Sequence, residues 1–155
     1  MNAKITKHKL NIELSKEVYE ECKERLEMKE CYLNVFYAMT AFEDRFRDGE
    51  WEVAYGYMRV LPDGNLMVRH CFIVNEKGEA IDPTLFTQKD FKETTDKQHT
   101  SFVIFDDVEE YIQMVLGNER MPDLLKPLME LEIDVAGEWA KQEGLNLVGG
   151  MYNGR

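Results

Sequence analysis

The chain has 155 residues, of which 44% are apolar, a length and composition that suit one domain spanning residues 1–155. Its formal charge of −11 at pH 7 repels phosphate backbones, which argues against direct nucleic-acid binding. The first twenty residues hold no apolar segment, and no apolar run reaches the roughly 18 residues of a membrane span. We therefore expect a cytoplasmic protein without a membrane contact.

The cysteine count bears on redox state and metal content. Cys22, Cys31 and Cys71 are odd in number and show no Cys-x-x-Cys spacing, which argues against a disulfide framework and against a common zinc site. We expect reduced thiols. Neither a P-loop nor a Gly-x-Gly-x-x-Gly motif occurs, so no nucleotide cofactor is expected.

Two helices are predicted in the first third of the chain. Ser15 is a good N-cap for a helix that runs to about Met28, with apolar residues four apart on one face. A second helix begins near Glu30 or Cys31 and stops at Gly49, because apolar residues follow the helical period up to a glycine. Cys31 then lies in the first turn of a core helix.

Three strands are predicted next, over residues 51–60, 66–75 and 79–82. The strong turn sequence 62–65 joins the first two as a hairpin, and a turn at 76–78 leads to the third. Pro83 ends the third strand because it has no backbone N–H to donate. The three strands form an antiparallel meander.

The hydrophobic pattern is weaker in the last third of the chain. Residues 101–105 are a short apolar run that suits a fourth strand. Asp106 or Asp107 caps a helix that runs to about Leu116. A last helical region starts at Pro122, is kinked or divided by Pro127 and ends near residue 144. The fold class is therefore α+β, with N-terminal helices packed on an antiparallel sheet of three to four strands and a helical C-terminal region.

Cys31 is the first candidate for chemistry. The N-terminus of a helix lowers the pKa of a thiol, because backbone N–H groups and the helix dipole stabilise the negative sulfur. The same N–H groups can hold an oxyanion. The alternative is a buried structural cysteine, which is how we interpret Cys22 and Cys71.

His70 and Asp82 are the candidate partners of Cys31. His70 stands in an apolar row on one strand face, where an ionisable ring needs a polar partner. If the turn at 76–78 has three residues, position 72 lies opposite Asp82, which makes the carboxylate a diagonal neighbour of His70. A core histidine and an Asx-type turn are the alternatives. His8 and His99 lie in polar segments and are expected to face solvent.

Four segments together resemble a known family. They are Cys31-Tyr32-Leu33-Asn34, Trp51-Glu52-Val53-Ala54-Tyr55-Gly56-Tyr57, Arg69-His70-Cys71-Phe72 and Ala80-Ile81-Asp82-Pro83-Thr84. Over about residues 15–86 the chain resembles the transglutaminase-like branch of the papain-like superfamily, which includes arylamine N-acetyltransferases and many small bacterial and phage proteins of unassigned function. The resemblance implies Cys31 as nucleophile, His70 as base and then acid, and Asp82 as the group that fixes the imidazole tautomer.

Three further residues are tentative substrate contacts: Asn34, Gly56 and Tyr57. Asn34 follows Cys31 by one helical turn, although a buried amide bonded to the backbone is the favoured alternative. Gly56 can admit a close backbone approach or mark a β-bulge. A zinc site of Cys31, His70 and Asp82 is a less favoured alternative, so no metal is expected.

The leading hypothesis is a cysteine hydrolase or acyltransferase that acts on a peptide or a small acyl substrate. Substrate specificity is expected in residues 84–100 and in the tail 144–155. A catalytically silent member of the fold that binds a basic protein partner through acidic residues is the alternative, because Lys29 and Glu30 precede Cys31 without an amide donor.

Overall fold

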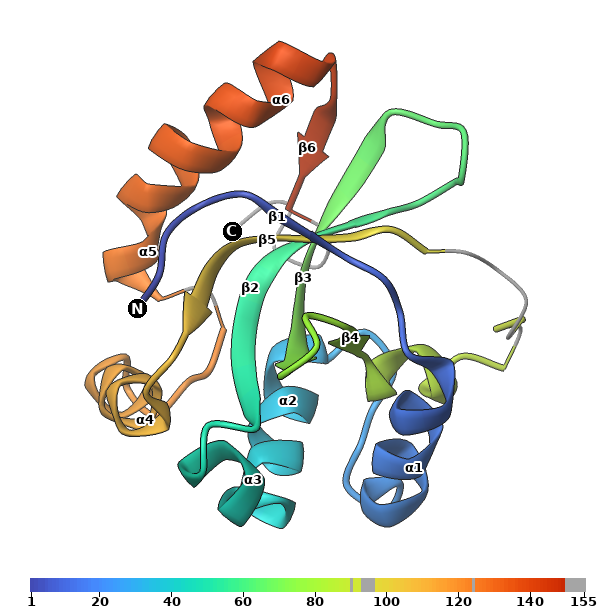
Figure 1. The fold of residues 1–155 in the computed structure, drawn as a ribbon, viewed down its shortest axis with the longest axis vertical. Coiled ribbons are helices and arrows are strands. Elements are labelled where there is room, and N and C mark those ends of the chain that lie inside the picture. The colour runs from blue at the N-terminus through green and yellow to red at the C-terminus, as the bar shows by residue number, and fades with distance from the viewer. Residues whose placement is uncertain (90, 93–96, 124, 150–155) are drawn as a thin grey trace.

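The computed structural model describes residues 1–89, 91–92, 97–123 and 125–149, and Figure 1 shows its mixed α+β fold. Within this part of the chain the strands form one six-stranded sheet with the order β1-β5-β2-β3-β4, and β6 pairs with β3. The strands are β1 (Thr6–His8), β2 (Trp51–Arg59), β3 (Leu66–Asn75), β4 (Ala80–Ile81), β5 (His99–Phe105) and β6 (Asn146–Val148). The predicted α+β class is confirmed, but the predicted number of strands is too small.

The predicted meander of β2, β3 and β4 is antiparallel throughout. The turn between β3 and β4 has three residues, because the N–H of Asn75 donates to the carbonyl of Glu79 at 3.0 Å. Ile73 pairs with Ile81, so the same register places Asp82 opposite Phe72 and diagonal to His70. The three-residue turn therefore brings Asp82 to the strand face that carries His70.

The sheet differs from the predicted one at its edges. The strand expected at residues 101–105 starts two residues earlier, at His99, and pairs with β2 across a bulge at Tyr55 and Gly56. β1 and β6 were not predicted, because three-residue strands are too short to show an alternating pattern. β6 is parallel to β3, so the sheet is not wholly antiparallel.

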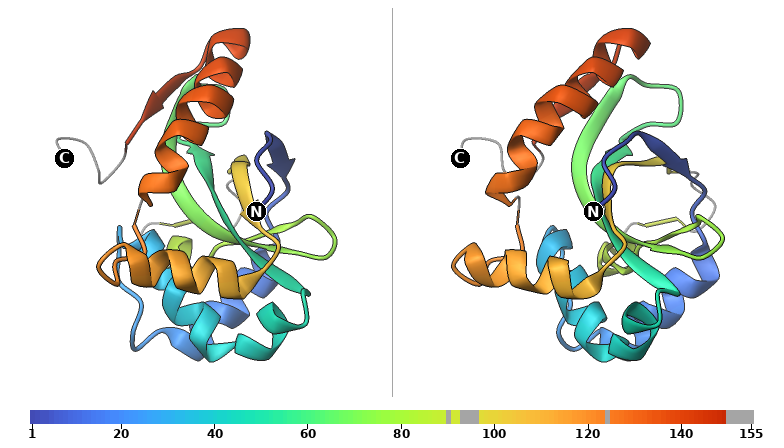
Figure 2. Two further views of the ribbon diagram at one scale, coloured as in Figure 1. Left: turned by 90° about the vertical axis from the view of Figure 1, so that its left-hand side faces the viewer. Right: turned by 60° about the vertical axis from the view of Figure 1, so that its left-hand side comes forward.

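The two edges of the sheet meet and close it into a ring. β1 pairs with β5 at one edge, and Leu10, just after β1, forms a parallel bridge to Ala80 of β4 at the other. The N–H of Ala80 donates to the carbonyl of Lys9, and the N–H of Asn11 donates to the carbonyl of Ala80, both at 2.8 Å. The strong curvature of β2 and β3 in Figure 2 is what this closure requires.

The N-terminal helices depart from the prediction at their ends. Helix α1 (Ile12–Cys22) is capped by Asn11, whose Oδ1 accepts from the N–H of Leu14, and not by Ser15, which lies one turn inside the helix. Asn and Ser are about equally good caps, so the sequence alone does not separate them. The second predicted helix is observed as two helices, α2 (Cys31–Ala41) and α3 (Glu43–Arg47), which are separated at Phe42.

The C-terminal helical region is continuous past its proline. Helix α4 (Val108–Gly117) starts after Asp107, as predicted. A second helical stretch follows, formed by α5 (Lys126–Leu131), a π-helical segment η2 (Glu132–Gly137) and α6 (Glu138–Glu143). Pro127 lies in the first turn of α5, where its missing N–H costs no hydrogen bond. The helix therefore starts at Lys126 and not at Pro122, and the prediction that Pro127 kinks or divides the region is wrong. Figure 2 shows the stretch as one long rod.

Two hydrophobic clusters lie on opposite faces of the sheet. The larger cluster packs α2, α4 and α6 against one face. The smaller cluster lies inside the closed ring of strands and consists of Phe72, Ala54, Val74 and Ala80. Three imidazole rings also pack on Phe72, namely those of His8, His70 and His99, with centroid distances of 5.7, 6.3 and 5.0 Å. His8 and His99 are buried, so the expectation that they face solvent is wrong.

Candidate active site

Cys31 is the first residue of α2 and is only 5% exposed. Glu30, the N-cap residue of α2, makes no side-chain capping hydrogen bond. Cys31 lines a pocket of about 320 Å³ together with His70. The other lining residues are Lys29, Met58, Val68, Arg69, Thr84 and Gln88.

His70 lies between the thiol and the carboxylate. Its Nε2 is 2.7 Å from Oδ2 of Asp82, and the Cys31 thiol interacts with the same ring. Burial lowers the pKa of His70, but the Asp82 carboxylate and the Cys31 sulfur raise it, and the net result is a pKa well above the ordinary 6.5. The arrangement favours an imidazolium ring beside the sulfur.

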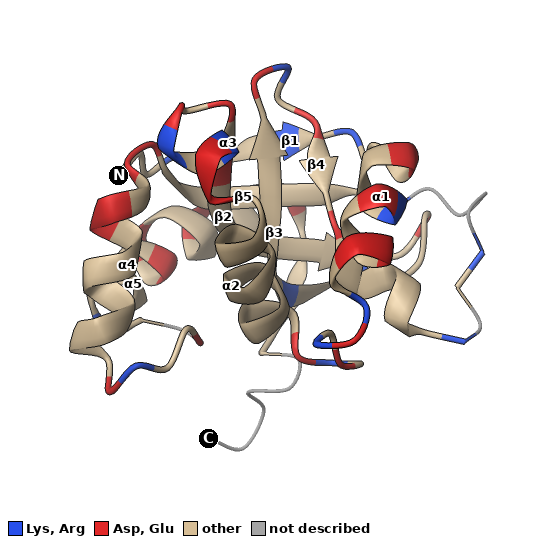
Figure 3. Ribbon diagram, turned by 90° about the horizontal axis from the view of Figure 1, so that it is seen from below, with Lys and Arg blue, Asp and Glu red and all other residues tan. Residues whose placement is uncertain are grey.

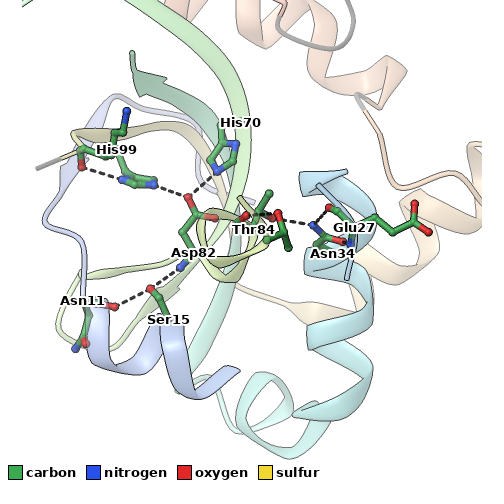
Figure 4. Close-up of polar contacts among 10 residues, drawn as sticks. Asn11, Ser15, Glu27, Asn34, His70, Asp82, Thr84 and His99 are labelled. Carbon is green, nitrogen blue, oxygen red and sulfur yellow. Dashed lines mark hydrogen bonds and ion pairs between the residues drawn. The ribbon is translucent and has the colours of Figure 1, made fainter. Parts of the chain in front are cut away.

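Asp82 is fully buried and is held from its backbone as well as its side chain. Its N–H donates to Oγ of Ser15 at 2.8 Å, and the Ser15 hydroxyl donates to the carbonyl of Asn11 at 2.6 Å (Figure 4). Burial raises the pKa of Asp82, but the charge of His70 and hydrogen bonds from His70 and His99 outweigh it and hold the pKa below its usual range. Asp82 is therefore a carboxylate at neutral pH.

His99 is a fourth member of this cluster that the sequence did not indicate. Its Nε2 is 2.7 Å from Oδ2 of Asp82, the same oxygen that His70 contacts, and its Nδ1 is 3.1 Å from the carbonyl of Lys97. Figure 4 shows the two rings approaching the carboxylate from different strands. The one available signal was that His99 stands two residues before the apolar run 101–105, close enough to belong to the same strand.

The two histidines and the carboxylate are also metal-ligand types. One ligand atom from each of His70, Asp82 and His99 lies within 4.8 Å of the others. Both Nε2 atoms, however, are at hydrogen-bond distance from one oxygen, whereas a metal ion needs unprotonated nitrogens at about 2.0–2.1 Å from itself. The geometry is that of a hydrogen-bonded cluster, and Cys31 is not part of the group.

Asn34, the first of the three tentative substrate contacts, does not line the pocket. Its amide donates to the carbonyl of Glu27 at 2.7 Å and to Oγ1 of Thr84 at 3.1 Å, and its Oδ1 accepts from the N–H of Glu27 (Figure 4). These bonds join the start of α2 to the short 3₁₀ helix η1 (Pro83–Thr87), which follows Asp82. Asn34 thus connects the segments that carry Cys31 and Asp82.

Gly56 and Tyr57 also lie outside the pocket lining. Gly56 is at the bulge, and a Cβ atom there would lie 2.0 Å from the carbonyl oxygen of Thr100, so the close backbone approach is that of β5 and not of a substrate. The hydroxyl of Tyr57 donates to Glu132 at 2.8 Å, and its ring packs on Trp139. Tyr57 ties α6 and η2 to the sheet.

Six of the pocket residues were not predicted as site residues, and Gln88 and Lys29 are two of them. Gln88 supplies an amide in the pocket of Cys31, although no amide side chain precedes the cysteine in sequence. Lys29 has a left-handed backbone with φ of 67°. Gln88 falls in the segment 84–100 where specificity was expected, but residues 90, 93–96 and 150–155 of the two expected specificity segments lie outside the described residues.

The acidic residues that the structure describes do not line this pocket. Figure 3 shows Asp and Glu on α1, α3 and α4, whereas α2 carries no charged residue. No carboxylate lines the pocket of Cys31, and two cations, Lys29 and Arg69, do. In the part of the chain that the structure describes, no helix is both long and apolar enough to cross a membrane.

Comparison of the chain with protein-family models, with curated proteins and with solved structures gave no match.

Proposed function

We propose that this protein is a cysteine-nucleophile hydrolase or acyltransferase of the papain-like, transglutaminase-like type, acting on an amide, ester or thioester. The observation that carries the proposal is the position of His70 between two partners. Its Nε2 is 2.7 Å from Oδ2 of Asp82, and its ring interacts with the thiol of Cys31, which opens α2 and faces a pocket. These are the nucleophile, base and orienting group of a thiol-dependent acyl transfer.

The reaction proceeds through an acyl-enzyme. The Cys31 thiolate attacks the carbonyl carbon and the carbonyl π electrons move to oxygen, giving a tetrahedral oxyanion. Collapse of this intermediate breaks the bond to the leaving group, which takes a proton from the His70 imidazolium and leaves a thioester on Cys31. Water or an amine then gives its proton to His70 and attacks the thioester, and the thiolate departs with the S–C bond electrons.

Two kinds of hydrogen-bond donor near Cys31 are candidates for the oxyanion. The backbone N–H groups at the start of α2 are close to Cys31 because the residue is itself at the first helical position, and the N-cap residue Glu30 makes no side-chain capping hydrogen bond. The amide of Gln88 lines the same pocket. These groups supply the hydrogen-bond donors that residues 29 and 30 do not provide as amide side chains.

The fold supports the proposed family in its broad features. A cysteine opens a buried helix, and the histidine and aspartate come from an antiparallel strand and the end of its neighbour, in the order Cys31, His70, Asp82. We propose a cytoplasmic enzyme whose substrate is a peptide or a small acyl compound. The pocket of about 320 Å³ suits one side chain or one short acyl group at a time.

Thiol reactivity at low pH tests this proposal without knowledge of the substrate. A thiolate paired with an imidazolium reacts at about pH 5.5, whereas ordinary thiols are protonated there. The protein is labelled with iodoacetamide, and the modified residues are located by mass spectrometry. Cys22 and Cys71 are internal controls, because burial raises the pKa of both thiols. We expect Cys31 to react first and His70→Ala to remove its advantage.

The proposal is overturned if Cys31 reacts no faster than Cys22 and Cys71 and if His70→Ala makes no difference. That result would favour the silent alternative, in which the excess of 30 acidic over 19 basic residues serves to bind a basic protein. In that case, a captured basic protein would dissociate with salt and would still bind Cys31→Ala.

A further inference from the structure

The second histidine on Asp82 has a role that the triad alone does not explain. We propose that His99 is a positioning residue of the site, which holds Oδ2 of Asp82 against His70 and thereby supports the imidazolium that faces Cys31. The inference rests on the proposed function, since it assigns His99 to the same thiol chemistry. His99 touches neither the pocket nor the sulfur in the described contacts, so it acts through Asp82.

The carboxylate of Asp82 is held through one of its two oxygens. Oδ1 of Asp82 is buried and has no hydrogen-bond partner among the described residues, so the side chain is oriented through Oδ2 alone. Two donors, Nε2 of His70 and Nε2 of His99, reach that oxygen at 2.7 Å each. Without His99, the carboxylate has a single side-chain bond and is free to turn either oxygen toward His70.

Both ring nitrogens of His99 contact oxygen atoms. Its Nε2 faces the Asp82 carboxylate and its Nδ1 faces the carbonyl of Lys97, and both of these oxygens only accept hydrogen bonds. The Oδ2 atom of the Asp82 carboxylate can only accept, so the contact at 2.7 Å needs a proton on Nε2 of His99. His99 therefore holds Asp82 as a hydrogen-bond donor.

The titratable groups around His99 are few and come from several elements. Asp82 approaches from the end of β4, and the ring of His70 on β3 lies 5.8 Å away between centroids. His8 on β1 is close enough for the charge of His99 to contribute to lowering the pKa of His8, although burial is the larger cause. No other charged side chain is recorded in contact with His99 in the described part of the chain.

The test is the pH profile of Cys31 alkylation in two variants. His99→Phe keeps a ring against Phe72 but removes both donors, and His99→Gln keeps one N–H that can reach Oδ2. We expect His99→Phe to move the acid limb of the profile upward by at least about one pH unit, which is about tenfold in rate at pH 5.5. We expect His99→Gln to recover most of the wild-type rate. A purely structural role would lower stability and leave the limb unchanged.

The outcomes separate this inference from the proposed function. A wild-type protein without reactive Cys31 at pH 5.5 contradicts both. A reactive wild-type protein with the same acid limb in folded His99→Phe contradicts only the role of His99. If His99→Phe does not fold, nuclear magnetic resonance of isotope-labelled histidine in the wild-type protein decides instead. The inference requires a proton on Nε2 of His99, and an unprotonated Nε2 would overturn it.

Discussion

Nε2 of His70 donates a hydrogen bond to Oδ2 of Asp82 across the β3–β4 pair, at 2.7 Å and within the closed ring of strands. Both side chains are buried, so the bond is not in competition with water. In such a place, the carboxylate and the imidazolium depend on each other, because either charge alone is costly to bury.

Asp82→Asn keeps the shape of the side chain and removes its charge. We expect a loss of about 3–5 kcal/mol in the free energy of unfolding, as for other buried ion pairs broken at one partner. We also expect Cys31 labelling at about pH 5.5 to fall at least about tenfold, since the pKa of His70 loses its main support. Urea denaturation and mass spectrometry measure the two effects.

Asp106→Asn is the matched control for this change. Asp106 pairs with the N-terminal amine at 2.8 Å but is 62% exposed, and exposed pairs contribute less than about 1 kcal/mol. Equal destabilisation by the two substitutions would contradict the larger contribution that we assign to the buried ion pair of Asp82.

Gly56→Ala tests the close contact between β2 and β5. A Cβ atom at this position would lie 2.0 Å from the Thr100 carbonyl oxygen, and that atom belongs to backbone that cannot rotate away. We expect a destabilisation of about 3 kcal/mol, at the upper end of the cost of overpacking, measured by thermal or urea unfolding. His99 directly precedes Thr100 in β5. We therefore also expect Cys31 labelling at low pH to fall in Gly56→Ala.

Gly137→Ala provides the comparison for Gly56→Ala. A Cβ atom at Gly137 would meet nothing within 4 Å, and the residue is helical. Alanine is the better helix former by about 1 kcal/mol, so the substitution should leave stability unchanged or raise it. If Gly56→Ala and Gly137→Ala change the free energy of unfolding equally, the close contact between Gly56 and β5 is not the cause of the destabilisation.

The charge of the pocket predicts a preference among thiol reagents. Arg69 is neutralised by Glu132 through bonds of 2.8 and 2.6 Å, whereas Lys29 has no ion pair within the described residues. Lys29 therefore attracts anions to Cys31. We expect Lys29→Gln to lower the rate ratio of anionic iodoacetate to neutral iodoacetamide about two- to threefold, as for a unit charge at the edge of water.

Lys23→Gln is the control for the Lys29 variant. Lys23 pairs with Glu20 at 3.1 Å and does not line the pocket of Cys31. Its removal changes the net charge of the protein by the same amount, so the reagent ratio should stay at the wild-type value. A similar fall in both variants would mean that net charge, and not the pocket, sets the preference.

Because His8 is buried, we expect the protein to lose stability on mild acidification. Burial lowers the pKa of His8, so below the ordinary value of 6.5 the unfolded ring takes up a proton that the folded ring does not. Its stabilising contribution is therefore complete above pH 6.5 and is lost as pH falls. His70 acts in the opposite direction, because its pKa is raised and its contribution is lost only as pH rises. The two contributions therefore change on opposite sides of pH 6.5 in the wild-type protein.

His8→Gln separates them. Glutamine can donate to the carbonyl of Gly78 and accept from Ser101, as His8 does, without titrating. We expect the thermal midpoint of the wild-type protein to fall more steeply between about pH 7 and pH 5 than that of His8→Gln. Parallel curves would show that His8 does not take part in the acid response.

The central part of the fold was predictable from sequence because its signals are local. The β3 strand was predicted over residues 66–75 and observed over the same residues, since apolar residues alternate between two clear turns. The turn at 76–78 fixed the register and with it the position of Asp82 beside His70. Cys31 opens α2 as predicted, because the apolar helical period starts there.

The features that the sequence did not indicate depend on contacts between distant segments of the chain. His99 looks polar in sequence, and only its pairing in β5 and its bond to Asp82 make it a buried residue. β1 and β6 carry three residues each, too few for a period to be read. Gln88 reaches the pocket through η1, whose path after Pro83 no local pattern specifies.

The bridge between Leu10 and Ala80 determines when the site can form during folding. The β2–β3 hairpin needs only neighbouring residues, whereas the bridge and the pairing of β1 with β5 join the N-terminus to segments far along the chain. Loop-closure entropy makes such distant pairings slow. A refolding chain should therefore acquire its helices and hairpin early, and low-pH reactivity of Cys31 should appear only in the last kinetic phase.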